Sequence, residues 1–133
     1  GPDAQLPAGS VGVMLSIGQV LEVLRQAPPD HQVWFDFCRT RPLKVTSWRG
    51  SYAEPALTWA EDDGVTTAAA LIAQLEGAIA TGAVFHGYKG GEYRYEATDL
   101  VRVDNWGRCT NTEIHKITFD EYEVLIHTRR EGE

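Results

Sequence analysis

Aromatic rings, cations and glycines are interleaved in the stretch from residue 84 to residue 95. An aromatic face such as that of Phe85 can stack on a flat ring, and Lys89 can hold an anion. Gly90 and Gly91 allow a backbone to come close and to offer its N–H groups to a phosphate. A ligand that is planar at one end and anionic at the other, as a nucleotide is, needs all three features. The same residues also fit a simple β-hairpin that turns at residues 89–91, with its aromatics acting as strand residues.

Two other segments combine an aromatic ring, a glycine and a cation, namely residues 48–52 and residues 105–108. Each adjoins an expected strand, and loops gather at the ends of a sheet. If the three segments converge, the cations would hold phosphates, the rings would stack on a base, and the asparagine would read ring edges or ribose hydroxyls. The predicted ligand-binding residues are the cations Arg49, Lys89 and Arg108, the aromatics Tyr52, Phe85, Tyr88 and Trp106, the glycines Gly90 and Gly91, and Asn105.

Catalytic signatures are not evident in the sequence. No serine lies in a G-x-S-x-G motif, and neither Cys38 nor Cys109 has the context of a nucleophile. The glycines match neither a dinucleotide fingerprint nor a Walker loop. We therefore expect a binding protein that is not an enzyme and needs no cofactor. A metal site is not expected either, because no two histidines have the spacing of metal ligands among His31, His86, His115 and His127.

The composition is that of an ordinary globular protein, with 133 residues, 43% apolar and 23% charged. No apolar run approaches the roughly 20 residues that cross a bilayer, so no membrane partner is expected. The net charge of −7 argues against binding duplex nucleic acid. It remains compatible with a small anionic ligand in a local basic pocket, or with a basic protein partner. The widely spaced Cys38 and Cys109 are expected to be buried thiols in a reducing compartment.

The hydrophobic pattern predicts an α+β fold, a mostly antiparallel β-sheet of about seven short strands with two α-helices. A capping box opens the first helix at Ser16, and a threonine opens the second at residue 66 or 67. Residues 1–13 are expected to be a disordered tag or linker, with Met14 as the natural start and 14–133 as a single α+β domain. Four aromatics are expected in the core, namely Trp34, Phe37, Trp59 and Phe119. Two arginines, Arg129 and Arg130, are expected in a frayed C-terminal tail.

From Met14 onward the chain resembles a family of small bacteriophage proteins. The matching segments are Ser16–Leu24, Pro28–Phe37, Arg49–Tyr52, Thr67–Ile79 and Gly87–Tyr93, and the last of these is the most specific. In size and layout the chain is similar to the Thoeris anti-defence sponges, which capture cyclic nucleotide signals such as glycocyclic ADP-ribose. Residues 119–133 lie outside this likeness.

The resemblance implies a non-enzymatic protein that acts in the cytoplasm of the infected bacterial host as a homodimer or higher homo-oligomer. It also implies that Phe85 would stack on the base and that Arg108, with Arg49 next, would hold phosphates. Two alternatives remain open. One is an acidic protein-binding inhibitor, of the anti-CRISPR or immunity type. Its contacts would be Glu61, Asp62, Asp63, Asp120 and Glu121, which otherwise read as solvated loop charges. The other alternative is an enzyme that acts on the same nucleotides.

Overall fold

The computed structural model describes residues 14–48, 54–87, 90–104 and 111–131. These residues form two helices and eight strands, one strand more than expected, and they confirm the α+β class. The elements in chain order are α1 (Ile17–Leu24), β1 (Gln32–Phe35), β2 (Arg41–Ser47), β3 (Pro55–Ala60), α2 (Ala68–Ala78), β4 (Phe85–His86), β5 (Glu92–Tyr93), β6 (Arg102–Val103), β7 (Asn111–Phe119) and β8 (Glu123–Arg130).

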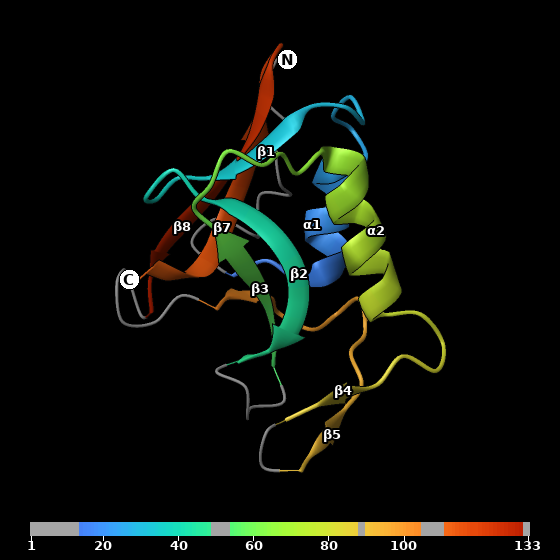
Figure 1. Cartoon of the computed structure of the whole chain (residues 1–133). Helices are drawn as coiled ribbons and strands as arrows, with labels where there is room; N and C mark the ends of the chain where they lie inside the picture. The colour runs from blue at the N-terminus through green and yellow to red at the C-terminus, as the bar shows by residue number, and fades with distance from the viewer. Residues whose placement is uncertain (1–13, 49–53, 88–89, 105–110, 132–133) are drawn as a thin grey trace.

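Six strands form one mixed sheet in the order β1-β8-β7-β6-β3-β2, and β4 and β5 form a separate hairpin (Figure 1). The β1–β8 and β3–β6 pairs are parallel, and the other pairs are antiparallel. The two edge strands of this sheet are consecutive in the chain, and the turn between them is tight. The Phe35 N–H donates to the Thr40 carbonyl at 2.9 Å, and the Thr40 N–H donates to the Phe37 carbonyl at 3.2 Å. The sheet therefore curls until β1 and β2 meet.

The gap between β1 and β2 is bridged by the segment that leads into α2. The Val33 N–H donates to the Thr66 carbonyl at 2.8 Å. On the other side, the Thr66 hydroxyl donates to the Pro42 carbonyl at 2.6 Å. Since both edges bond to the same short segment, neither edge strand is left open there for pairing with another chain.

Both helices lie on the same side of the curled sheet (Figure 1). The expected capping box is present in α1, because Ser16 Oγ accepts from the Gln19 N–H at 3.1 Å and Gln19 Oε1 accepts from the Ser16 N–H at 2.9 Å. In α2, Thr67 is the capping residue, and its hydroxyl accepts from the Ala70 N–H at 3.1 Å. The apolar residues of α1 are almost fully buried, so its amphipathic stripe packs into the core.

One hydrophobic cluster joins both helices to the inner face of the sheet. Phe37 belongs to it as expected, and the half-buried rings of Trp59 and Phe119 pack against it. The prediction for Trp34 is wrong. Its partner across the parallel β1–β8 pair is Leu125, and both are half-buried while their neighbours in sequence are buried. Because alternate strand residues face opposite sides, Trp34 lies on the outer face of the sheet.

The C-terminal arginines are also placed differently from the expectation. Strand β8 continues to Arg130, which pairs with Asn111 of β7. Arg129 Nε donates to Glu113 Oε1 at 3.1 Å, and Glu113 is only 7% exposed. The two arginines therefore belong to the sheet and not to a frayed tail, since β7 is long enough to pair with them. No helix in the described ranges is long and apolar enough to span a membrane.

Candidate functional site

The β4–β5 hairpin contains the described part of the predicted ligand-binding stretch. Phe85 pairs with Tyr93, the Gly87 N–H donates to the Gly91 carbonyl at 2.8 Å, and the Gly90 N–H donates to the Gly87 carbonyl at 2.9 Å. Gly90 has a φ of +90°, which favours glycine. The hairpin interpretation of these residues is thus confirmed. Since the N–H groups of Gly87 and Gly90 bond within the turn, neither is available to a phosphate.

Phe85 is half-buried and packs on Tyr95, with 4.9 Å between the ring centroids. Tyr95 in turn reaches the ends of two sheet strands: its hydroxyl donates to Ser47 Oγ at 3.0 Å and to the Glu54 carbonyl at 3.3 Å. Burial raises the pKa of Tyr95, so its hydroxyl keeps the proton that it donates. The Trp48 N–H also donates to the Glu54 carbonyl, at 2.7 Å. Phe85 is therefore tied to the residues that flank segment 49–53.

Asp104, which precedes the third predicted segment (residues 105–108), bonds to other residues than those that contact Tyr95. The Asp104 N–H donates to the Leu57 carbonyl at 2.8 Å, and the Asp104 carbonyl accepts from Trp59 Nε1 at 3.0 Å. Glu54 lies just before β3, whereas Trp59 lies near its other end. The flank of segment 49–53 therefore lies at the start of β3, whereas Asp104, which precedes segment 105–110, bonds to residues further along that strand. Seven predicted site residues lie outside the described residues, and their roles stay predictions; they are Arg49, Tyr52, Tyr88, Lys89, Asn105, Trp106 and Arg108.

Arg102 is a cation near the 49–53 flank that the sequence analysis did not single out. Its guanidinium carbon lies 5.2 Å from the centroid of the Trp48 ring. Its Nη1 atom is buried without a hydrogen bond, 3.9 Å from Glu113 Oε2 and 3.8 Å from Glu131 Oε1. In the sequence Arg102 reads as an ordinary strand residue, and only the pairing of β6 with β3 and β7 brings it to this position.

A second candidate region is the outer face around Trp34. A concave surface of about 620 Å³ extends from Trp34 and Leu125 to Glu123 and the turn after β1. A neighbouring hollow of about 400 Å³ also includes Trp34 and extends to residues 61–64. Arg39 contributes to both hollows. We call this region the Trp34 surface and define it by Trp34, Asp36, Arg39, Glu61, Asp63, Glu123 and Leu125.

The turn that forms one wall of the Trp34 surface has an unusual backbone. Cys38 and Arg39 have φ angles of 51° and 52°, a region that residues with a β-carbon rarely adopt. Such a turn favours Asn-Gly, and each non-glycine residue there costs about 1–2 kcal/mol. Asp36 fixes the start of the turn, because Oδ2 accepts from the Thr128 N–H at 3.0 Å and Oδ1 accepts from its hydroxyl at 2.5 Å. The positive φ angles carry Cys38 to the surface, so the expectation of a buried thiol is wrong there.

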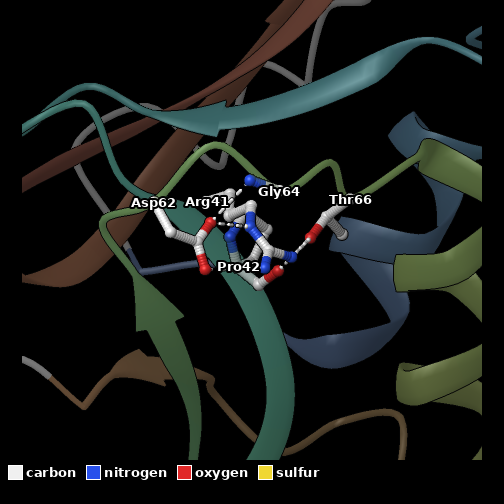
Figure 2. Close-up of polar contacts among 5 residues, drawn as sticks. All are labelled: Arg41, Pro42, Asp62, Gly64 and Thr66. Atoms are coloured by element: carbon white, nitrogen blue, oxygen red, sulfur yellow. Dashed lines mark hydrogen bonds and ion pairs between the residues drawn. The ribbon is translucent and has the colours of Figure 1, made fainter.

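The opposite wall is the loop of residues 61–64, which Arg41 holds in place (Figure 2). Arg41 Nε and Nη2 donate to the two Asp62 carboxylate oxygens at 2.7 and 3.0 Å, and Nη1 donates to the Thr66 hydroxyl at 3.0 Å. The Gly64 N–H donates to Asp62 Oδ1 at 2.9 Å. The hydrogen bond from Arg41, followed by that from Gly64, lowers the pKa of Asp62. Asp62 is therefore not the solvated loop charge that the sequence suggested.

Asp120 is likewise committed to the structure. Its Oδ1 accepts from the Tyr122 N–H at 2.7 Å and from the Glu123 N–H at 3.0 Å, and these bonds lower the pKa of Asp120. They shape the β7–β8 turn, which leaves the Tyr122 side chain 78% exposed. Among the five carboxylates expected to contact a protein partner, two thus have structural roles.

No group of three or more His, Cys, Asp or Glu side chains within the described ranges could hold a metal ion. Comparison with protein-family models, with curated proteins and with solved structures finds no match. The hairpin region and the Trp34 surface are the two candidate sites among the described residues.

Proposed function

We propose that this chain is a bacteriophage binding protein that sequesters a cyclic nucleotide-type immune signal, such as an isomer of cyclic ADP-ribose, without cleaving it. The observation that supports the proposal best is the position of Tyr95, which packs on Phe85 and bonds to residues on both sides of segment 49–53. Phe85 is thus tied through Tyr95 to Ser47 and Glu54, which flank the segment that contains the predicted phosphate ligand Arg49. The resemblance of residues 87–93 to phage proteins, an expectation from the sequence alone, supplies the biological context.

The chemistry of such a site meets the needs of a sponge. Stacking on an aromatic ring contributes on the order of 1–3 kcal/mol per base, and charged hydrogen bonds to phosphate add to it. A competitor of an immune receptor needs a Kd near 1 nM, which corresponds to about −12 kcal/mol. A cyclic ligand loses little conformational entropy on binding, so stacking and phosphate contacts can supply most of that free energy. The same proposal includes a homodimer or higher oligomer in the host cytoplasm.

A thermal-shift experiment with a chemical readout tests this function. The protein is incubated with cyclic ADP-ribose isomers and with cyclic dinucleotides, its unfolding is followed, and the ligand released on heating is analysed by mass spectrometry. We expect stabilisation by at least one ligand, which is recovered chemically intact. The ligand affinity derived from the thermal shift should fall about tenfold in Phe85→Leu. It should be unchanged in Phe119→Leu, which is a control at another half-buried ring. The absence of stabilisation by every ligand would refute the proposal, and a converted ligand would indicate an enzyme.

A second candidate function, an acidic inhibitor that binds a basic protein, is favoured by the Trp34 surface. The exposed carboxylates of Glu61, Asp63 and Glu123 border this surface, next to a large aromatic ring. A test should replace Asp63, Glu121 and Glu123 while it spares Arg49 and Arg108. Asp62 and Asp120 are to be left intact, because their substitution would disturb the fold as well as the surface charge. If partner binding survives the triple substitution unchanged, this second function is wrong.

A further inference from the structure

We infer that the Trp34 surface binds an arginine side chain of a basic protein partner. In this arrangement the guanidinium lies against the Trp34 indole, and Asp63 and Glu123 approach it from two sides. The inference rests on the second candidate function and names the site and the chemistry through which that function would act.

The first argument is the composition of the surface. Trp34 is half-buried on the outer face of the sheet, beside Leu125, and it is not part of the hydrophobic core. A large indole that the core does not use is a suitable platform for a planar cation, and Trp is the best aromatic partner for one. Arginine and tryptophan are also the residues that most often dominate protein interfaces.

The second argument is charge. Five carboxylates line the two hollows. Asp36, Asp63 and Glu123 have no arginine partner among the described residues, whereas Glu61 has further interactions of its own. The fifth, Asp62, is neutralised by Arg41. Among the described lining residues Arg39 is the one cation. The local balance is therefore negative, as is the whole chain at −7, and the surface repels anions and attracts cations.

The third argument is preorganisation. Arg41 and Thr66 fix the loop of residues 61–64, and the two bonds from Thr128 fix Asp36. The Cys38–Arg39 turn, which forms the other wall, keeps side chains where glycine would relieve the backbone strain. Strain of this kind is retained most often at functional sites. A surface that is rigid before binding loses little entropy when a partner docks.

The direction in which replacing Arg39 changes the binding affinity distinguishes a cationic from an anionic ligand. An anionic ligand at this surface would need Arg39, so its removal would weaken binding. A cationic ligand would be repelled by Arg39, so Arg39→Gln should strengthen binding, by about twofold or more at low salt. A purely structural role for the surface predicts no change of either sign.

The probe is an acetylated and amidated peptide in which arginine alternates with glycine, titrated into the full chain by calorimetry at about 50 mM salt and again at about 200 mM. A matched peptide with citrulline in place of arginine keeps the shape of the side chain and removes its charge. We expect measurable binding of the arginine peptide, little binding of the citrulline peptide, and weaker binding at the higher salt concentration.

Substitutions then locate the site. Trp34→Leu should weaken binding by about twofold to thirtyfold, and Trp34→Phe should weaken it less, because a cation binds less strongly over Phe. The double variant Asp63→Asn/Glu123→Gln should weaken binding by about fivefold. Its control is Glu92→Gln/Glu96→Gln, which removes the same charge at and just after the hairpin. Unfolding temperatures of all variants should be compared, so that a loss of binding is read only from folded protein.

The possible results distinguish a failure of the inferred arginine site from a failure of the second candidate function. If the arginine peptide does not bind to the unmodified protein, the inference fails, whereas the second candidate function is tested separately by the substitutions of Asp63, Glu121 and Glu123. If it binds but the Asp63/Glu123 variant loses no more affinity than the Glu92/Glu96 control, the attraction is general and the inference alone fails. Weakened binding in Arg39→Gln would also overturn the inference. Strengthening in Arg39→Gln, together with specific losses at Trp34 and at the Asp63/Glu123 pair, supports it.

Discussion

Replacing Thr66 with valine keeps the shape of the side chain and removes its hydroxyl group. In the native protein this hydroxyl is buried, donates to the Pro42 carbonyl at 2.6 Å and accepts from Arg41 Nη1 at 3.0 Å (Figure 2). Both bonds hold the segment that bridges the two edge strands. We expect Thr66→Val to destabilise the fold and to loosen the loop of residues 61–64, which forms one wall of the Trp34 surface.

The size of the effect follows from the two bonds. A buried acceptor that loses its donor costs about 1–3 kcal/mol, and Arg41 loses less because it keeps both of its bonds to Asp62. We therefore expect a loss of about 2 kcal/mol in the free energy of unfolding. For 133 residues the entropy of unfolding is about 0.28 kcal/mol/K, so the melting temperature should fall by about 7 °C.

Thermal unfolding followed by circular dichroism measures this change, and Thr66→Ser is the matched control because it retains the hydroxyl. The serine variant should lose less than half as much stability as the valine variant. A melting temperature of Thr66→Val within about 1 °C of the unmodified protein would show that the hydroxyl is not needed, and the account of the bridging segment would then be wrong. Equal losses in both variants would assign the effect to the methyl group and would contradict the reasoning in the same way.

Four more substitutions have predicted effects on stability, which urea or thermal unfolding measures. Gly64→Ala should destabilise the fold by about 1 kcal/mol or more, because a Cβ there would lie 2.4 Å from Arg41 Nη2. In contrast, a Cβ at Gly77 in α2 would meet nothing within 4 Å, so Gly77→Ala should stabilise the fold by about 0.5–1 kcal/mol. The pKa of Asp62 is lower in the folded protein than its unfolded value of about 3.9. The charged carboxylate therefore stabilises the fold above that pH. This stabilisation is lost as the pH falls through the folded pKa. Asp62→Asn should therefore show a flatter loss of stability below about pH 4, and identical curves would contradict this assignment. Tyr95→Phe should cost about 1 kcal/mol, since the hydroxyl bonds to both Ser47 and Glu54.

Local patterns in the sequence predicted local structure well. The capping box at Ser16 is present as expected because both partners are three residues apart and need no tertiary contact. The apolar residues at every second position of 33–37, namely Val33, Phe35 and Phe37, likewise lie in the core, as expected for a strand with one buried face. The same alternation contained the signal for Trp34, which shares the opposite face with Asp36. The expectation that a large aromatic ring belongs in the core concealed this signal, since it considered residue type and not the side of the strand.

Features that depend on distant residues could not be read from the sequence. The parallel pairing of β1 with β8 joins residues about 90 positions apart, and no local pattern announces it. Arg41 and Asp62 are 21 positions apart, and they approach to 2.7 Å because β2 pairs with β3 so that Arg41 lies opposite Ala60. In the same way, Arg102 becomes visible as a cation beside Trp48 only when β6 is inserted between β3 and β7.

The two candidate regions differ in the ligand that their charges allow, and this difference decides between the functions. The Trp34 surface has more carboxylates than cations, so a nucleotide would be repelled there even though the ring and the volume would suit its base. Under the proposed function, the nucleotide would therefore bind near Phe85, where Phe85 supplies the ring and the predicted Arg49 would supply the charge. It follows that Phe85→Leu and Arg39→Gln act on different ligands. An effect of Arg39→Gln on a cyclic nucleotide, or of Phe85→Leu on the arginine peptide, would contradict this assignment of charge to surface.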